Sequence, residues 1–576
     1  MVQYTPAQEL AIVTTGCDLL VSASAGTGKT AVLVERVLRL CMHSESPVDL
    51  DRLLIVTFTE AAASEMRERL QTAFSVAIER GEGDSRLLRR QLVLLDRAQI
   101  STIHSFCGSL LRQHFHRLGL DPDFAVQTEE RARLLQAEVI EQVFRDYLER
   151  GDWRFLEWLE TFSGADPSEN AAGELRAIHR FLVSLPDGEE WMERTRSAYP
   201  LDSRGRGLVR DARDQLWFED WKRLHWERVE RWAELAAETL ERAKGLGLDK
   251  PVEWLGRAAN LLDQANTAFR LGHEEEALLA LREYVFGTYP GPRGKNKTPE
   301  TDALKDDVDI WVKEWKDTYI PSSSLEYPPD AALPSELARA HAASASRVHL
   351  LLELVRDFER AYQESKRRRR VLDFSDLENF ALRLLRDEGN RPSDIAQLCR
   401  DQYEHVLIDE YQDVNPLQDA LFRLVSRGEG DERPGNLFAV GDIKQCIYQF
   451  RRAEPKLFLE KYRAARVLEP GADVGAGASW RIDLQENFRS LAGVLESVNT
   501  VCRGIMLEET AGFEYDANAE LKPGLEEIAL TGETPSAEML LVDLPPRGMD
   551  MPEIDDYSAL SNVEKEAFIV GRRIIE

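Results

Sequence analysis

A glycine-rich segment near the N-terminus constrains this chain more than any other feature. Residues 23–30 read ASAGTGKT, between an apolar run at 18–22 and a helical pattern at 28–41. Glycines at 26 and 28 let backbone N–H groups curl around phosphate oxygens, and the N-terminus of the following helix adds partial positive charge. The segment therefore predicts a phosphate-binding loop between a strand and a helix.

Each residue of this loop has an expected task. Lys29 can reach the β- and γ-phosphates of a nucleotide, and the hydroxyl of Thr30 can ligate Mg²⁺. Ala23 replaces the glycine that usually opens the motif. The predicted phosphate cradle comprises Ala23, Ser24, Ala25, Gly26, Thr27 and Gly28.

A second apolar run ends in two carboxylates. Residues 406–408 read VLI and are followed by Asp409 and Glu410. A phosphate-loop site needs one carboxylate for Mg²⁺ and another to orient and deprotonate the attacking water, both at the carboxyl end of a neighbouring strand. We assign these tasks to Asp409 and Glu410, so the two motifs together predict nucleoside triphosphate hydrolysis.

The rest of the pattern predicts an α/β fold, a P-loop parallel-sheet domain interrupted by a large all-helical insertion. Apolar runs separated by helical segments imply a buried parallel sheet. Strands are expected at 18–22, 52–58, 99–102, 405–408 and 436–440, and helices at 28–41 and 60–70. Residues 123–365 carry long amphipathic patterns, such as 128–150 and 342–364. A separate segment is expected from 480 to 576, with a strand at 538–543 and a helix at 561–575.

Composition limits the cellular context. Lys and Arg number 73 against 102 Asp and Glu, a net charge of −29. This balance repels nucleic acid at long range, although a basic or aromatic groove can lie inside an acidic shell. Six scattered cysteines without a C-x-x-C pair, no secretory signal and no long apolar run favour a reducing cytoplasm.

Six further boxes resemble superfamily 1 helicases of the UvrD/Rep family, in the family's order. They read YTPAQ at 4–8, TFT at 57–59 followed by EMR at 65–67, STIHSFC at 101–107, DEYQD at 409–413, VGDIKQCIYQFR at 440–451 and LQENFRS at 484–490. Residues 372–377 (LDFSDL) and 450–458 (FRRAEPKLF) look most like the AddA branch, with the RecB branch as the near alternative.

The resemblance implies further roles around the nucleotide. Gln8 is expected to read adenine, and Phe488 to stack on it. Gln445 is expected to sense the γ-phosphate or the attacking water, and Arg489 to act as an arginine finger. The family's motor places ATP between two RecA-like domains, here 1–122 with 366–470 and, in part, 480–576, with the insertion at 123–365.

The resemblance also implies a track for single-stranded DNA, because a motor must grip bases without reading their sequence and aromatic stacking does so. The expected contacts are Thr57, Phe58, Thr59, His104, Ser105, Phe106, Tyr448, Phe450 and Arg451. For each aromatic residue, core packing is the alternative reading. Lys366–Arg370 (KRRRR) fits either a phosphate contact or a solvated helix face.

The resemblance thus predicts the N-terminal portion of an ATP- and Mg²⁺-dependent 3′→5′ DNA helicase that acts in double-strand-break repair. Its expected partners are single-stranded and duplex-end DNA and an AddB-like second subunit. No motif V, motif VI or nuclease box follows Arg489, so we expect residues 1–576 alone to hydrolyse ATP poorly. The alternatives are a non-catalytic subunit that binds DNA or acts as a scaffold, and a fragment that only binds ATP.

Overall fold

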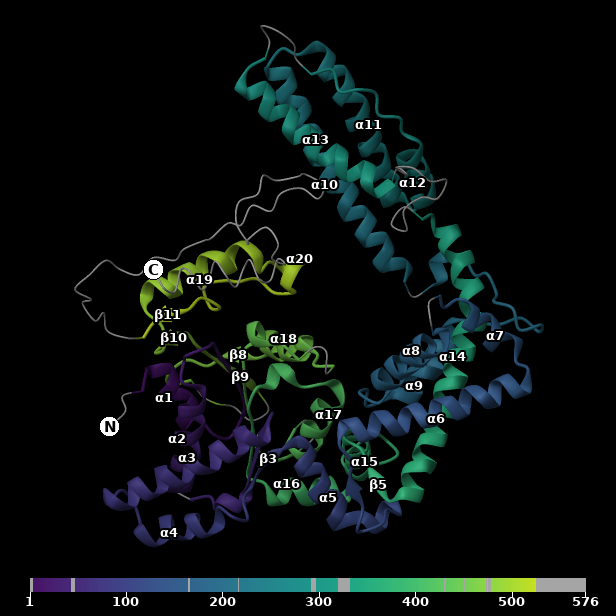
Figure 1. Cartoon of the computed structure of the whole chain (residues 1–576). Coiled ribbons are helices and arrows are strands. Elements are labelled where there is room, and N and C mark those ends of the chain that lie inside the picture. Colours follow the sequence, from purple (N-terminus) through teal and green to yellow (C-terminus); the bar gives the residue numbers. More distant parts are fainter. Residues whose placement is uncertain are drawn as a thin grey trace, which may run out of the picture. The chain divides into compact units, whose positions relative to one another are not determined.

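The structure is a computed structural model that describes residues 4–42, 47–163, 166–215, 217–291, 297–319, 332–428, 431–448, 452–472, 474 and 478–524. The chain divides into two compact units. Unit 1 comprises Met1–Phe106 and Leu384–Glu576, and unit 2 comprises Cys107–Arg383. Figure 1 shows both units and labels most of their helices and several of their strands.

In the described part of unit 1, seven strands form one sheet in the order β3-β2-β6-β7-β1-β9-β8, and all neighbouring strands run parallel. Parallel strands need crossover connections, so helices cover the sheet faces. This arrangement confirms the predicted α/β class. The strands are β1 (Asp18–Ala23), β2 (Leu53–Thr57), β3 (Gln99–Thr102), β6 (His405–Ile408), β7 (Leu437–Gly441), β8 (Arg466–Val467) and β9 (Ser479–Leu484).

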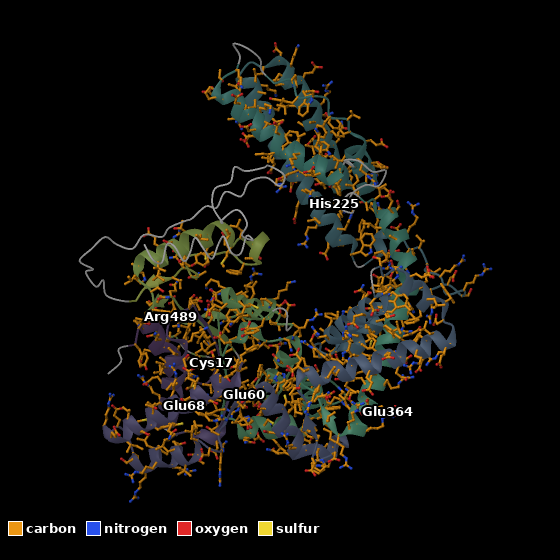
Figure 2. All side chains as sticks on the ribbon, in the orientation of Figure 1. Cys17, Glu60, Glu68, His225, Glu364 and Arg489 are labelled. Atoms are coloured by element: carbon orange, nitrogen blue, oxygen red, sulfur yellow. The ribbon has the colours of Figure 1, made fainter. Side chains whose placement is uncertain are left out.

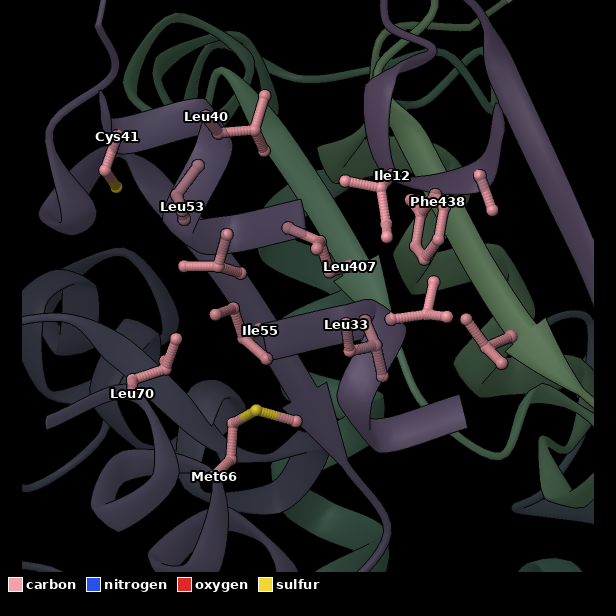
Figure 3. Close-up of a cluster of buried hydrophobic side chains, with 14 of the residues drawn as sticks. Ile12, Leu33, Leu40, Cys41, Leu53, Ile55, Met66, Leu70, Leu407 and Phe438 are labelled. Carbon is pink, nitrogen blue, oxygen red and sulfur yellow. The ribbon is translucent and has the colours of Figure 1, made fainter. Parts of the chain in front are cut away.

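Helices α2 and α3 bury their apolar sides against this sheet. All five residues of β2 are buried, as expected for a strand covered on both faces. Figure 3 shows Leu33 and Leu40 of α2 and Met66 of α3 beside side chains of the strands, and all belong to one buried cluster. The helices of unit 1 are α1 (Pro6–Val13), α2 (Lys29–Met42), α3 (Glu60–Glu79), α4 (Ser85–Leu94), α16 (Asp394–Gln402), α17 (Pro416–Val425), α18 (Pro455–Ala464), α19 (Ala492–Ile505) and α20 (Glu508–Ala511).

Unit 2 is predominantly helical and has two large apolar clusters. One joins α6–α9 to α14, and the other joins α10–α13. Trp232 of α10 is buried in the second cluster. The helices are α6 (Glu129–Arg150), α7 (Trp153–Glu160), α8 (Pro167–Leu182), α9 (Gly188–Ala198), α10 (Phe218–Gly245), α11 (Asp249–Leu271), α12 (Glu274–Glu283), α13 (Pro299–Tyr319) and α14 (Pro334–Arg369). Among the described helices, none is both long and apolar enough to cross a membrane.

Two helices contain the points at which the chain passes between the units. Helices α5 (Ile103–Leu118) and α15 (Phe374–Leu385) contain the residues where unit 1 gives way to unit 2 and returns. The sequence analysis places these divisions at 122/123 and 365/366, whereas the compact units divide at 106/107 and 383/384. Two small parallel ladders complete the described fold, β4 (Ala125–Val126) with β5 (Val371–Leu372) and β10 (Glu486–Asn487) with β11 (Lys522–Pro523).

The predicted strands and helices of the motor region are present with small shifts at their ends. The expected helix at 60–70 extends to Glu79, because Met66, Phe74 and Ala77 continue its buried face. Residues 480–484, expected to open a second domain, instead lie in β9 and pair with β1 along its whole length. The strand predicted at 538–543 and the helix predicted at 561–575 lie outside the described residues, and the three-domain division stays a prediction.

Candidate active site

The phosphate loop joins the carboxyl end of β1 to the first turn of α2. Ala23 is the last residue of β1, and Lys29 and Thr30 begin α2. The loop is closed internally, because the Thr27 hydroxyl donates to the Ser24 carbonyl at 2.8 Å. The helix therefore presents its N-terminal N–H groups at the loop, as anion binding requires.

The two loop glycines are required by backbone geometry and by space. Gly26 and Gly28 have φ of 76° and 81°, in the left-handed region that favours glycine. A Cβ on Gly26 would lie 2.6 Å from Nδ2 of Asn487, and one on Gly28 would lie 3.2 Å from Nε2 of Gln8. The loop thus forms a cradle of backbone groups with no room for side chains, which fits a polyphosphate.

Lys29 and Glu410 meet although 381 residues separate them in the chain. The Lys29 ammonium donates to both Glu410 carboxylate oxygens, at 3.1 and 3.0 Å. The contact arises because β1 and β6 lie in one parallel sheet, with β7 between them, so their carboxyl ends share an edge. The predicted phosphate-binding lysine and the predicted general base therefore belong to one site.

The acidic pair occupies a constrained turn. Glu410 has φ of 54°, an uncommon value for a residue other than glycine, and its N–H donates to Oδ1 of Asp409 at 3.0 Å. Burial, and then the Glu410 carboxylate, raise the pKa of Asp409 to about 6. Backbone strain and a perturbed carboxyl pKa in one turn are typical of functional sites.

A chain of hydrogen bonds extends from Glu410 to the predicted sensor residue. Gln412 Nε2 donates to Glu410 at 2.8 Å, and Gln412 Oε1 accepts the Asp442 N–H at 2.9 Å. Asp442 is 1% exposed, and its carboxylate accepts a 2.7 Å hydrogen bond from Gln445 Nε2. Gln445 is therefore joined to Glu410 through two intermediates, and both are side chains to which the sequence analysis assigned no role.

The segment that carries Phe488 and Arg489 is fixed directly to the phosphate loop. The Phe488 N–H donates to the Gly26 carbonyl at 2.8 Å. Buried Asn487 donates to the Ala25 carbonyl at 2.7 Å and accepts the Arg489 N–H at 2.8 Å. Phe488 and Arg489 are both exposed beside the loop, where a ring and a guanidinium are available to a nucleotide; Figure 2 labels Arg489.

Gln8 connects α1 to the same loop. Its Nε2 donates to the Thr27 carbonyl at 2.9 Å. Its Oε1 accepts the Thr5 N–H at 2.9 Å, completing a capping box at the start of α1. An amide has two N–H donors and two oxygen lone pairs, so Gln8, which is 6% exposed, has one of each beyond these two hydrogen bonds.

Two predicted DNA-contact aromatics from distant boxes lie together. The rings of Phe58 and Tyr448 have centroids 4.4 Å apart at an interplanar angle of 36°. Phe58 follows β2, and Tyr448 follows the turn after β7. Both residues thus lie beyond the carboxyl ends of strands, at the sheet edge that also bears Lys29 and Glu410.

The hydroxyl residues of these boxes surround a carboxylate that the sequence analysis did not single out. Glu60, at the start of α3 (Figure 2), accepts from the hydroxyls of Thr102 and Ser105, both at 2.7 Å. Those hydrogen bonds, and then the nearby positive charge of Arg67, lower the Glu60 pKa. A negative charge therefore lies within the predicted DNA surface. Its signal in the sequence was a carboxylate directly after the TFT box.

The remaining predicted DNA contacts fall into three groups. Thr59 caps α3 by accepting the Ala62 N–H, while Thr57 is 2% exposed and donates to the Thr59 carbonyl. Phe106 is 3% exposed and packs edge-on against Tyr403, so the core reading holds for this ring and we correct its assignment to DNA. Phe450 and Arg451 lie outside the described residues.

Lys366, the first residue of the KRRRR run, also differs from both of its sequence readings. It is 2% exposed and donates to Asp373 at 3.0 Å and Asp376 at 2.7 Å. The buried ammonium is neither a solvated helix face nor a phosphate contact. Its signal in the sequence was the pair of aspartates three residues apart in LDFSDL.

A phosphate loop at the carboxyl edge of a parallel sheet, with an acidic pair facing its lysine, defines the class of P-loop nucleotide-binding proteins. The family model of the UvrD/REP helicase N-terminal domain matches residues 4–174 and 248–466. The chain belongs to the UvrD/REP helicase family.

Curated relatives extend the match over the whole chain. It is 36% identical over 583 residues to a protein of Exiguobacterium sibiricum, and 36% identical over 586 residues to one of Bacillus pumilus. The names of both describe one subunit of an ATP-dependent helicase/nuclease, and in both matches the chain covers 100% of itself and 45% of the relative. A protein of the same name from Moorella thermoacetica is 37% identical over 537 residues. The chain thus spans less than half the length of the curated relatives it matches.

Proposed function

We propose that this chain is the ATP-binding portion of a DNA helicase motor that moves along single-stranded DNA. The observation that carries the proposal is the Lys29–Glu410 pair, which lies at the sheet edge that also bears the Phe58–Tyr448 ring pair. One edge thus offers both a triphosphate cradle and aromatic faces for bases. Family membership supports the same reading, as does the relatives' name, which describes an ATP-dependent helicase/nuclease.

ATP and Mg²⁺ fit the residues present. The cradle at Gly26 and Gly28 has no room for a side chain. Hard oxygen donors suit Mg²⁺, and Thr30 and Asp409 provide them. When bound, Mg²⁺ would supply charge neutralisation on the phosphates.

The chain's own residues then have defined tasks. Lys29 exchanges its Glu410 carboxylate for phosphate oxygens, which frees Glu410 to orient a water and accept its proton. Gln445, joined to Glu410 through Gln412 and Asp442, carries the state of that carboxylate towards Tyr448, three residues further along. Arg489 and Phe488 extend from the loop towards the phosphates and the base.

The wider assignment follows the relatives. For a protein at the relatives' full length, we propose 3′→5′ movement, action in double-strand-break repair and an AddB-like second subunit. Polarity is tested on duplexes with either a 3′ or a 5′ single-stranded tail, of which only the 3′-tailed substrate should be unwound. Unwinding from the 5′ tail would contradict the assignment.

The site itself is tested by replacing Lys29 with methionine, which preserves the length of the side chain and removes its charge. We expect Mg²⁺-ATP binding, followed by titration of a fluorescent ATP analogue, to be lost in residues 1–576. The matched control is Lys456→Met, which removes an exposed lysine of the same unit outside the site. Equal binding by both variants would exclude Lys29 from the nucleotide site.

A further inference from the structure

A fully buried arginine faces the end of the first helix. Arg36, in the second turn of α2, is 2% exposed. Its Nη1 donates to the carbonyls of Ala11 and Ile12, at 2.7 and 3.3 Å. Its guanidinium also lies 4.2 Å from the ring centroid of Phe438 in β7. Arg36 lies on α2, the helix that begins at the phosphate loop, and its side chain contacts both α1 and the central sheet.

Nothing in the described structure neutralises this charge by ion pairing, since no carboxylate of the described residues is an ion-pair partner of Arg36. A buried cation is costly unless it is well hydrogen-bonded. Burial lowers the pKa of Arg36 to about 10, which leaves it protonated at neutral pH. Its compensation is partial: Nη1 binds the carbonyl end of α1, which carries partial negative charge, and the guanidinium lies against the face of Phe438, while the buried Nε has no hydrogen-bond partner among the described residues.

Helix α1 depends on such contacts. It has eight residues, Pro6–Val13, and isolated helices of that length are not stable in water. Ala11 and Ile12 anchor it in the core, and Gln8, one turn earlier, reaches the phosphate loop through its 2.9 Å hydrogen bond to the Thr27 carbonyl. The position of Gln8 over the loop therefore depends on its own contacts with Thr5 and Thr27 and on the last turn of α1, where Arg36 holds the two carbonyls.

We propose that Arg36 is a positioning residue for the nucleotide base. It ties the C-terminal end of α1 to α2, and so holds the amide of Gln8 where its remaining donor and acceptor meet the edge of adenine. This inference rests on the proposed function and adds a residue that does not touch the nucleotide.

The chemistry of the base makes the proposal specific. Adenine presents an acceptor at N7 and a donor at N6, which a single amide can bind at once. Guanine presents two acceptors at the equivalent edge, and tripolyphosphate presents no base. Loosening α1 should therefore weaken ATP binding while leaving tripolyphosphate binding unchanged, because the cradle of Gly26 and Gly28 and the Lys29 ammonium are not contacted by Arg36.

The test compares Arg36→Met with the wild-type chain by calorimetric titration of Mg²⁺-ATP, Mg²⁺-GTP and Mg²⁺-tripolyphosphate. We expect ATP affinity to fall on the order of ten-fold, the size expected from losing a paired hydrogen-bond contact. Affinity for tripolyphosphate should stay constant, and the preference for ATP over GTP should disappear. Arg36→Lys, which keeps a donor for the carbonyls, should restore part of the preference and also serves if the methionine variant does not fold.

The matched control is Arg39→Met. Arg39 lies three residues further along α2 and pairs with Glu9 of α1 and Glu35, but its side chain is 28% exposed. Partly exposed ion pairs of this kind contribute little, so this variant should bind ATP, GTP and tripolyphosphate as the wild type does. A double variant, Arg36→Met with Gln8→Ala, should bind ATP no more weakly than Gln8→Ala alone, because Arg36 acts through Gln8.

Three results would overturn the inference: an unchanged preference for ATP in Arg36→Met, an equal loss of ATP and tripolyphosphate binding, or additive losses in the double variant. Absence of ATP and tripolyphosphate binding in the wild-type chain would instead count against the proposed function. The two failures are therefore distinguishable in one set of titrations.

Discussion

Each unit pairs a lysine with carboxylate, and the two sites differ in how completely they are closed to solvent and in the number of carboxylate partners. In unit 1, the Lys29 side chain is 14% exposed and its partner Glu410 is 33% exposed. In unit 2, Lys366 is 3% exposed and has two carboxylate partners, Asp373 and Asp376, which are also almost fully buried. The Lys366 ammonium in addition lies 4.0 Å from the centre of the Tyr362 ring.

The other hydrogen bonds around each lysine differ in the same way. Asp373 and Asp376 accept each other's backbone N–H, both at 2.9 Å, and so cap α15 while they bind Lys366. The network ties the end of α14 to the start of α15 and leaves little capacity for a ligand. Lys29 instead has one exchangeable partner at the mouth of an anion-binding loop. A buried ion pair is thus structural where its hydrogen bonds are complete, and functional where a ligand can replace one partner.

The largest expected effect concerns the open site. Glu410→Gln should retain ATP binding and lower the rate of hydrolysis by about 10²–10⁴-fold, because general-base catalysis contributes that much and an amide cannot accept the proton. Phosphate release in the presence of single-stranded DNA measures turnover, in residues 1–576 and in any longer chain that contains them. Undiminished turnover would remove Glu410 from the base role.

The closed site should show its effect in stability. Lys366→Met leaves two buried carboxylates uncompensated and should lower the free energy of unfolding of unit 2 by about 3–5 kcal/mol. Lys29→Met breaks a partly exposed pair and should cost about 0–1 kcal/mol. Urea unfolding followed by tryptophan fluorescence reports mainly on unit 2, which contains every tryptophan except Trp480. Equal losses for the two variants would erase the distinction between open and closed sites.

The aromatic pair beside the open site should contribute to DNA affinity. Phe58→Ala or Tyr448→Ala should weaken binding of a labelled single-stranded oligonucleotide by about 1–3 kcal/mol, because each ring is a stacking surface for a base. Phe374→Ala, which removes an exposed ring of unit 2, is the control. An unchanged affinity in both test variants would return this pair to a packing role.

Replacing Glu60 should have a smaller effect on DNA affinity, and of the opposite sign. Glu60→Gln keeps an acceptor for Thr102 and Ser105 but removes a negative charge from the predicted DNA surface. We expect single-stranded DNA to bind a few-fold more tightly at low salt, with the gain falling as salt screens it. The control is Glu68→Gln. Glu68 lies two turns along α3 (Figure 2) and is exposed, so its replacement should leave DNA affinity unchanged. A gain of equal size in both variants would indicate a general charge effect.

The smallest expected effect is on how the stability of unit 2 depends on pH. Burial, and then the charge of Asp373, raise the pKa of Asp376 from 3.8 to about 6. The folded state therefore binds more protons than the unfolded state between these values, so this group's contribution to stability is lost as pH rises from about 4 to about 6. Asp376→Asn should flatten that slope in urea titrations. The pKa of Asp373 is lowered, so its contribution to stability is instead lost as the pH falls below 4. If Asp376→Asn leaves the slope of stability against pH between 4 and 6 unchanged, the assignment to Asp376 is contradicted.

Local sequence patterns predicted the strands, the helices and the phosphate loop, but they could not predict several of the side-chain contacts between distant residues. The glycines before Lys29 and the apolar run before Asp409 identified both halves of the candidate nucleotide site, because loop chemistry and strand burial are local properties. Gln412 and Asp442 had no local signal for their shared hydrogen bond, which depends on β6 and β7 being neighbours. Phe106 is the opposite case. Its place in a family box predicted a DNA contact, but in the structure its ring packs against Tyr403.

The sequence by itself determined the phosphate loop, the acidic strand end and the parallel α/β class, because glycine conformational freedom, carboxylate chemistry and hydrophobic patterning act over a few residues. Only the tertiary structure decided that Glu410 faces Lys29, that Lys366 is a buried structural cation and that Arg36 holds the end of α1. Those facts depend on strand order and helix packing, which bring together residues far apart in the chain, such as Lys29 and Glu410 at a separation of 381.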